Sequence, residues 1–150
     1  MLARDLALPC PTIGLADDAQ HAARLMADQQ LPALVVCDPD GTPVGMLRGS
    51  HVVGVMVPPY LLEDSALARV IGEPAADRLV SGLRGRTVAD LLPPSAHGDL
   101  VVADADDTVM ELCVLMADGR SPVIPVVDGG RLLGCVTLHR LLDSLLSRTR

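Results

Sequence analysis

Residues 120–143 read RSPVIPVVDGGRLLGCVTLHRLLD, and this stretch decides the fold. The apolar run 123–127 predicts a short buried strand, and Asp128-Gly129-Gly130 is a tight-turn signal because glycine reaches positive φ without steric cost. Residues 132–136 predict a second strand. Thr137 is a fair helix N-cap, and leucines at helical spacing follow it. The stretch therefore predicts a strand, a hairpin turn, a strand and a helix.

Pro125 lies inside the first of these two strands. A proline has no backbone N–H to donate to a neighbouring strand, so prolines within sheets occur at edges, at strand starts or at bulges. We therefore expect this strand to lie at the edge of its sheet or to carry an irregularity.

The same unit occurs earlier, in residues 31–53, which read LPALVVCDPDGTPVGMLRGSHVV. A repeat of this length indicates two copies of one supersecondary unit. Four landmarks recur in the same order, about 90 residues apart: Leu25-Met26-Ala27-Asp28 and Leu115-Met116-Ala117-Asp118, Pro32 and Pro122, Asp38 and Asp128, and Gly45 and Gly134.

The order of these motifs resembles a tandem pair of cystathionine-β-synthase (CBS) domains, over roughly residues 10–56 and 87–147. Each copy has a helix, a proline, an apolar run that ends at aspartate, a glycine turn, a glycine with two apolar residues, and a helix. The resemblance implies an α/β (α+β) fold of two β-α-β-β-α units about a pseudo-twofold axis. We divide the chain into a first unit (1–56), a helical insertion (57–86) and a second unit (87–150).

Several further elements follow from local signals. Residues 12–15 are expected to form a short strand before the first unit, and Val101-Val102 the equivalent strand before the second. Two prolines, Pro58-Pro59, should end the last helix of the first unit. Within the insertion we expect two short helices, 61–70 and 75–83, which could form a lid, a partner surface or simple packing.

The composition limits the classes of function. The chain has 150 residues, 49% of them hydrophobic, which is enough for a core. A net charge of −7 argues against a nucleic-acid partner. The four cysteines form no CxxC motif and are expected to be reduced thiols, which suits the cytoplasm. With no leader signal and no run of about 18 apolar residues, we expect no direct membrane insertion.

In nucleotide-binding CBS units, the motif Gly-h-h-Thr/Ser-x-x-Asp typically comes after the second strand, where h is an apolar residue and x is any residue. The hydroxyl then helps hold phosphate, and the aspartate accepts from the ribose. Here the second unit keeps Thr137 but has Arg140 at the aspartate position, and the first unit has Arg48 and His51 in these two places. Arginine has only donors, so an adenine nucleotide is doubtful and an anionic ligand is favoured. The candidate ligand residues are Thr137, Arg140, Ser121, Pro122, Arg120, Pro32, Arg48 and Ser50.

Two hypotheses remain for the function. The first is a stand-alone regulatory module that senses a small anionic or nucleotide-like ligand and modulates a separate enzyme, transporter or channel. The second is a structural dimerisation or scaffold module with ligand-free clefts. The nearly all-apolar helix 109–116 and the leucine-rich helix 138–146 favour a homodimer in either case. The histidines and cysteines match no catalytic motif and no metal site, so neither an enzyme nor a cofactor is expected.

Overall fold

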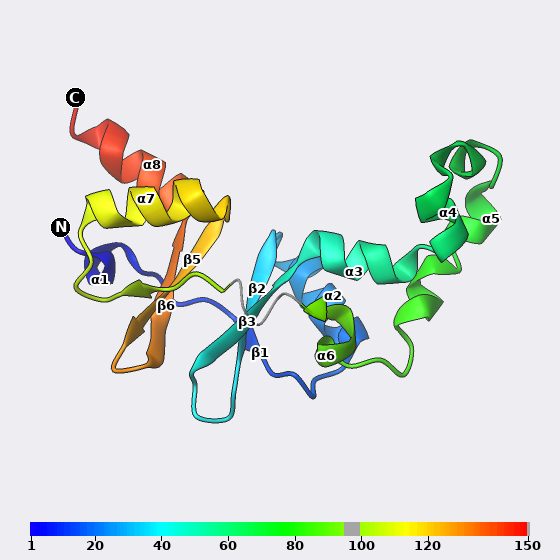
Figure 1. Ribbon diagram of the computed structural model, residues 1–150, viewed down its shortest axis with the longest axis horizontal. Coiled ribbons are helices and arrows are strands. Elements are labelled where there is room, and N and C mark those ends of the chain that lie inside the picture. The colour runs from blue at the N-terminus through cyan, green and yellow to red at the C-terminus, as the bar shows by residue number, and fades with distance from the viewer. Residues whose placement is uncertain (95–99, 150) are drawn as a thin grey trace.

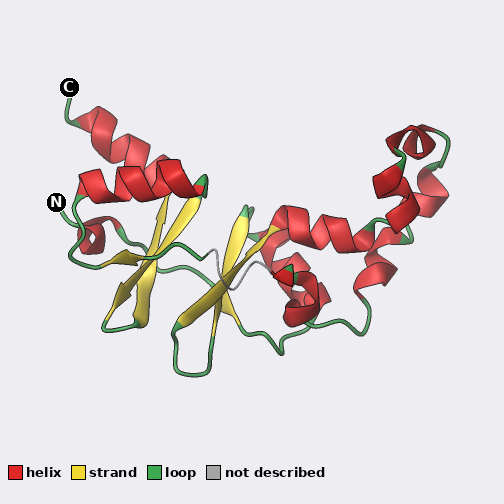
Figure 2. Ribbon diagram, viewed as in Figure 1, coloured by secondary structure: helices red, strands yellow, loops and turns green. Residues whose placement is uncertain are grey.

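The computed structural model describes residues 1–94 and 100–149 and contains two three-stranded sheets, each with helices on one face (Figures 1 and 2). The elements in chain order are α1 (Ala3–Leu6), β1 (Thr12–Ile13), α2 (Ala19–Asp28), β2 (Ala33–Cys37), β3 (Pro43–Arg48), α3 (Gly49–Met56), α4 (Pro59–Glu63), η1 (Ser65–Arg69), α5 (Glu73–Ala76), η2 (Leu79–Leu83), α6 (Val88–Leu91), β4 (Ala103–Asp104), α7 (Val109–Gly119), β5 (Val123–Asp128), β6 (Arg131–Thr137) and α8 (Leu138–Ser147).

The two sheets have the same topology. The first has the order β1-β2-β3 and the second β4-β5-β6, with a parallel pair followed by an antiparallel pair in each. Both antiparallel pairs shift register near the end of the middle strand, between Val36 and Cys37 and between Val126 and Val127. The repeated β-α-β-β-α unit is therefore confirmed, down to the position of its irregularity.

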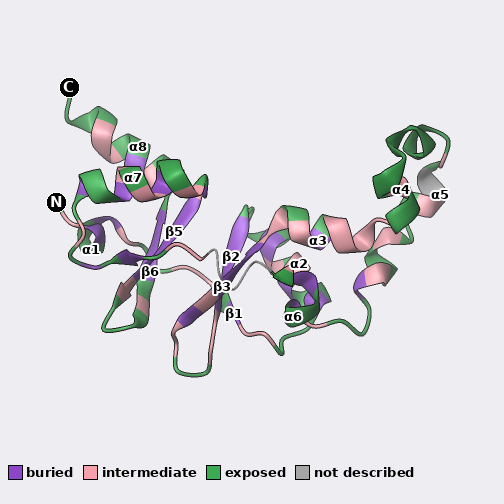
Figure 3. Cartoon of the chain, viewed as in Figure 1, coloured by how far each residue is buried: buried purple, intermediate pink, exposed green. Residues whose placement is uncertain are grey.

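Side-chain alternation along the strands builds three apolar clusters, since successive residues of a strand face opposite sides of the sheet. On β2, Leu34 and Val36 face the first unit's own core, while Ala33 and Val35 face the second unit. The inter-unit core, as we call this third cluster, joins the two sheets through their helix-free faces (Figure 3). Its buried members are Ala33, Val35, Met46, Val123 and Cys135.

The two units exchange their leading helices. Near the N-terminus, α1 packs into the second unit's core through Ala3 and Leu6, and the Ala3 N–H donates to the carbonyl of Asp107 at 2.8 Å. Conversely, α6 packs into the first unit's core through Val88 and Leu91. Figure 1 shows α1 beside the second sheet and α6 beside α2. Each core is therefore completed by a helix that the other half of the sequence supplies.

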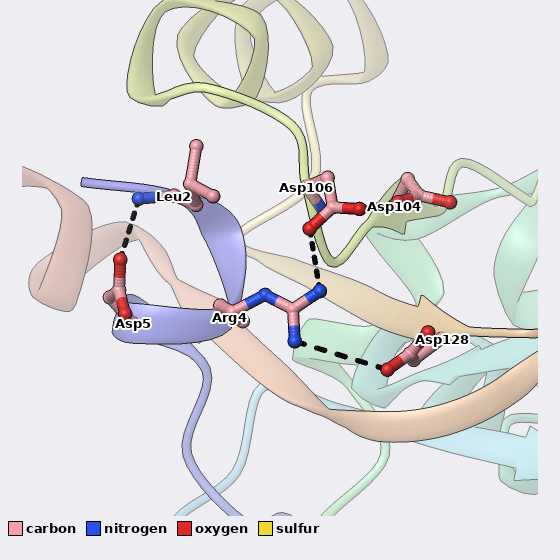
Figure 4. Close-up of polar contacts among 6 residues, drawn as sticks. All are labelled: Leu2, Arg4, Asp5, Asp104, Asp106 and Asp128. Carbon is pink, nitrogen blue, oxygen red and sulfur yellow. Dashed lines mark hydrogen bonds and ion pairs between the residues drawn. The ribbon is translucent and has the colours of Figure 1, made fainter.

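An ion-pair group lies over α1 on the surface (Figure 4). Arg4 contacts Asp106 at 2.5 Å and Asp128 at 4.0 Å, and its side chain is 42% exposed. The pKa of Arg4 is raised by its hydrogen bond to Asp106 and by the charge of that carboxylate. Exposed ion pairs contribute little to stability. The attachment of α1 therefore rests on its buried side chains and backbone hydrogen bonds.

Of the two alternatives for the strand with Pro125, the structure shows an irregularity and not an edge position, because β5 is the central strand of its sheet and its pairing with β6 shifts register. The backbone of Cys135, which faces Pro125 on β6, exchanges both hydrogen bonds with Leu8 on its other side. Pro125 therefore occupies a non-hydrogen-bonded position toward β6. On its other side, the pairing with β4 begins only at Val126. The backbone position of Pro125 therefore requires no N–H for pairing with β4 or β6. The expected irregularity is the register shift between Val126 and Val127.

Two other expectations need correction. The short strand before the second unit is Ala103–Asp104 rather than Val101-Val102. The insertion forms four short helical pieces instead of two, because glycine and proline interrupt it repeatedly. The described side chains of α4 and η1 include none that is buried, and Figure 1 shows these pieces projecting from the end of α3. As expected, α3 ends at Met56, just before Pro58 and Pro59.

Candidate functional site

Two helix starts, one in each unit, carry the candidate residues. Helix α3 begins after β3 and α8 begins after β6. In the first unit, Gly49 N–H donates to the carbonyl of Pro32 at 3.1 Å. In the second unit, Leu138 N–H donates to the carbonyl of Pro122 at 2.9 Å. Each proline precedes the middle strand of its sheet, so its carbonyl fixes where the helix starts.

In the second unit, the side chains at the helix start bind within the protein. The Thr137 hydroxyl accepts from the N–H of Arg140 at 3.2 Å and caps α8. The Arg140 Nε donates to the carbonyl of Leu6 at 3.2 Å. At the position where the family resemblance implies a ribose-binding carboxylate, this side chain instead holds the end of α1.

Arg120 and Ser121 lie in the connection between α7 and β5. Ser121 is buried, and its hydroxyl donates to the carbonyl of Val123 at 2.7 Å. The same oxygen lies 3.5 Å from the sulfur of Met46, so it faces the inter-unit core. Arg120 is exposed and ends α7 in the left-handed conformation, with φ of 48°. Arg120, Ser121 and Pro122 together line an apolar groove of about 430 Å³ between α7 and α8.

The start of α3 has a different electrostatic character. Arg48 occupies the N-cap, its backbone N–H donates to Nδ1 of His51 at 3.2 Å, and Ser50 is exposed beside them. The first turn contains no acidic residue, whereas α6 and α7 have Asp90 and Glu111 there. A cationic side chain at the positive end of a helix is unfavourable unless an anion compensates it. This end of α3 is therefore suited to an anion.

The pKa of His51 gives further evidence on the charges at the start of α3. Its pKa is lowered, first by burial and second by the positive charge of Arg48, which places the guanidinium near the imidazole. Nδ1 accepts a hydrogen bond only when it carries no proton. A neutral His51 therefore stabilises the helix start, and protonation would remove the acceptor for the Arg48 N–H.

This predicts a pH-dependent stability. Because the folded-state pKa of His51 lies below its ordinary value of 6.5, the stabilisation is fully present above pH 6.5 and declines as the pH falls below it. Denaturant unfolding at pH 7.5, 6.5 and 5.5 should show this loss. It should be smaller in His51→Asn, whose side-chain oxygen accepts at any of these pH values. His21→Asn is the control, and an identical pH profile for His51→Asn and the native protein would contradict the assignment.

A second cavity, of about 530 Å³, lies at the carboxyl ends of β1 and β2 and was not predicted from the sequence. Asp17 and Asp38 line it, and each carboxylate accepts backbone bonds, from Gly14 N–H at 2.7 Å and from Thr42 N–H at 2.9 Å respectively. Its acidic lining disfavours anions. The signal that could have found it is the parallel pairing of β1 and β2, since ligands often bind at the carboxyl ends of such strands. His51 was also missed as a candidate, although it stands three residues after the N-cap Arg48.

Two features of other functional classes are absent from residues 1–94 and 100–149. Within these ranges the side chains of His, Cys, Asp and Glu form no group of three or more that could hold a metal ion. No helix in the same ranges has the length and apolar character needed to cross a membrane.

Comparisons with known proteins agree on the family. The CBS domain family model matches residues 3–57 and 88–147. A CBS domain-containing protein of unknown function from Kribbella flavida is 40% identical, with a TM-score of 0.87 over 97% of this chain and 99% of that one. The CBS domain of a membrane protein from Sphaerobacter thermophilus is 28% identical, with a TM-score of 0.69 over 95% and 86%.

A more distant structure, CBSX2 in complex with AMP, is 20% identical and has a TM-score of 0.71, covering 99% of this chain and 98% of that one. CBSX2 is a CBS-pair protein from Arabidopsis thaliana. A search among curated proteins found no match. The duplicated sheet order, the exchanged helices and the match of the family model to both halves lead to one conclusion: the chain belongs to the CBS domain family, as a tandem pair.

Proposed function

We propose that this CBS pair is a non-catalytic regulatory module that binds a small anionic or nucleotide-like ligand at the start of α3 and modulates a separate partner protein, such as an enzyme, transporter or channel. The observation that carries the proposal is the uncompensated positive charge there. Arg48 stands at the N-cap beside His51, and the first turn has no acidic residue, in a chain whose net charge is −7. The AMP complex of CBSX2 supports the proposal, because it places a nucleotide on the same fold.

The side chains favour recognition of the anionic group over the ribose. His51 Nδ1 already accepts from Arg48 N–H, and Arg140 has only donors, one of which binds Leu6. Neither side chain can replace a carboxylate as the acceptor of hydrogen bonds from the ribose hydroxyls. We therefore expect an anion such as pyrophosphate to bind, and AMP and neutral adenosine to bind weakly or not at all.

Arg48→Ala should lower the affinity for pyrophosphate by roughly ten- to a hundredfold, because a charge-assisted contact contributes about 1.5–3 kcal/mol. Thermal shift at several ligand concentrations measures the change, since a ligand that binds the folded state raises the melting temperature with its concentration. Arg120→Ala is the control, because Arg120 lies in the second unit. An unchanged affinity in Arg48→Ala would contradict the location, and a loss in Arg120→Ala alone would move the site to the groove between α7 and α8.

We also propose that the module acts as a homodimer. The outer faces of α7 and α8 expose apolar side chains: Met110, Val114, Leu138, Leu142 and Leu146. Exposed apolar surface of this kind marks interaction sites, and a twofold axis would bury both copies of it at once. The groove between the two helices supplies a concave complement to the leucines of α8.

Light scattering at micromolar concentration should return twice the chain mass of 15.7 kDa. Val114→Asp combined with Leu142→Asp should give the monomer, because it places charges in the apolar contact. Val53→Asp, at an exposed position of α3, is the control. A native protein that elutes and scatters as a 15.7 kDa monomer would contradict the dimer.

The second candidate function is a dimerisation or scaffold module with ligand-free clefts. It is favoured by the hydrogen bonds that Ser121 and Arg140 make within the protein. The ligand screen separates the two functions, because a scaffold shows no melting-temperature increase with any anion. We place either function in the cytoplasm, where the four free cysteines would remain reduced.

A further inference from the structure

Three of the four cysteines, from segments far apart in the sequence, meet at the inter-unit core. Cys135 of β6 is buried, at 4% exposure. Cys10 and Cys37 are half-buried and pack against the same cluster. Cys113 lies elsewhere, on α7 in the groove beside α8. The fold therefore concentrates thiols between the two sheets.

The N-terminal segment brings Cys10 to this place. Leu8 exchanges two backbone hydrogen bonds with Cys135, of 3.0 and 2.9 Å, and so adds a short bridge to the free edge of β6. Cys10 follows two residues later, just before β1 enters the first unit. It thus lies where the chain crosses from the second sheet to the first, and it packs against the inter-unit core that contains Cys135.

We propose that Cys10 and Cys135 are a peroxide-oxidisable thiol pair, which closes to a disulfide and fastens the N-terminal segment to β6. The proposal is independent of the ligand site at α3. It assigns a modification site to residues that the proposed function leaves unused.

The surroundings shift the pKa values of the two thiols in opposite directions. The side-chain contact with Cys135 lowers the pKa of Cys10, which favours the thiolate form of Cys10 over that of its partner. The same contact raises the pKa of Cys135, and burial raises it further. The pKa of Cys37 is raised by burial and by its acidic neighbours, the Cys10 thiolate and Asp38. Because the thiolate is the nucleophile, the half-exposed Cys10 is the sulfur that meets the oxidant.

The chemistry takes two steps. The Cys10 thiolate attacks one oxygen of hydrogen peroxide, the O–O bond breaks, and Cys10 becomes a sulfenic acid while the other oxygen leaves and is protonated to water. Cys135 sulfur then attacks the sulfenic sulfur, and the hydroxyl group departs with the Cys135 proton as a second water. Two thiols lose two electrons in total, and one peroxide is reduced to two waters. A low-molecular-weight thiol reverses the bond by exchange.

The disulfide would close a very long loop, since it joins residue 10 to residue 135. Constraints on long loops restrict the unfolded chain most, so the oxidised protein should melt roughly 10 °C above the reduced protein. The disulfide would also attach the segment between α1 and β1 to β6, and so keep α1 in the second unit's core.

The test treats the reduced full-length chain with hydrogen peroxide and maps its thiols by alkylation and mass spectrometry. We expect the mass to decrease by that of two hydrogen atoms and a cross-linked peptide to join Cys10 and Cys135. Cys37 and Cys113 should still be alkylated. Cys10→Ser should abolish the cross-link, whereas Cys37→Ala and Cys113→Ala should keep it, and dithiothreitol should reverse it. Cys10 lies in an extended segment, so its replacement tests the pair even if a Cys135 variant fails to fold.

A second readout uses the reduced native protein without any variant. At pH 7.5, iodoacetamide should modify Cys10 roughly tenfold faster than Cys37, because only Cys10 has a lowered pKa. A cross-link between Cys10 and Cys37 would overturn the assignment. So would oxidation of Cys10 to sulfinic acid without any cross-link, or a disulfide between chains through Cys113.

Discussion

Replacing Leu6 with alanine is expected to lower the free energy of unfolding by about 3 kcal/mol, although Leu6 belongs to a four-residue helix at the N-terminus. The reason is that α1 is part of the second unit's core. Leu6 is 3% exposed there, among residues that lie about 100 positions later in the chain. Removing its side chain leaves a cavity that β5 and β6 cannot close, because hydrogen bonds fix their backbones.

The pseudo-symmetry of the fold supplies a matched control. Leu91 of α6 occupies the equivalent place in the first unit's core, also at 3% exposure, so Leu91→Ala should cost a similar amount. Leu8→Ala, two residues beyond Leu6, alters a side chain that is 48% exposed and should change stability by less than about 1 kcal/mol. Urea unfolding measures all three. If Leu6→Ala were as mild as Leu8→Ala, the exchange of leading helices would not hold in solution.

Gly134→Ala is expected to cost about 2 kcal/mol, the scale of an overpacked contact. A methyl group there would stand 2.6 Å from the carbonyl oxygen of Leu8 and 3.0 Å from its carbon. Because both atoms belong to backbone, and Leu8 is hydrogen-bonded to Cys135, no side-chain rotation relieves the clash. The N-terminal segment would have to separate from β6.

Gly45→Ala is the matched control for this change. Gly45 is the equivalent glycine of the first unit, yet a methyl group there would meet only Leu92 Cδ1, at 3.5 Å, and the Val36 Cβ, at 4.0 Å. These are ordinary contacts, so the cost should stay below about 1 kcal/mol. Amide hydrogen exchange at Leu8 should accelerate in Gly134→Ala and remain slow in Gly45→Ala. Equal effects of the two substitutions would show that the missing side chain of Gly134 is not what allows the N-terminal segment to pack against β6.

The sequence predicts the duplicated unit well because every landmark of the repeat is local. A proline, an apolar run, a turn and a capped helix each act within a few residues, so both copies can be aligned by eye. The exchanged helices escape this alignment. The N-cap Thr87 predicts the helix at 88–92, but Leu6 and Leu91 are 85 residues apart instead of about 90, and nothing local to either short helix shows that it packs into the other unit.

Pro125 shows a similar limit. A proline without its N–H predicts an edge strand or an irregularity, but which of the two occurs depends on how far β4 extends, and only the folded sheet determines this.

The candidate site is predictable in composition and less so in geometry. The sequence identifies Arg48, Thr137 and Arg140 because they occupy a repeated motif at a helix start. It cannot tell that Arg140 binds the carbonyl of Leu6, since the two residues are 134 positions apart. Nor can it tell that the Ser121 hydroxyl faces Met46 of the other unit. These partners exist only once the two units are packed together.

The most direct test of the regulatory proposal is isothermal titration calorimetry of the native protein with pyrophosphate, AMP and adenosine. Recognition of an anion at the start of α3 predicts that pyrophosphate binds and that AMP and adenosine bind at least roughly tenfold more weakly, because adenosine lacks the charge that Arg48 and the helix end would contact and the ribose of either compound finds no accepting carboxylate. AMP or adenosine binding as tightly as pyrophosphate, or no heat with pyrophosphate at millimolar concentration, would contradict it.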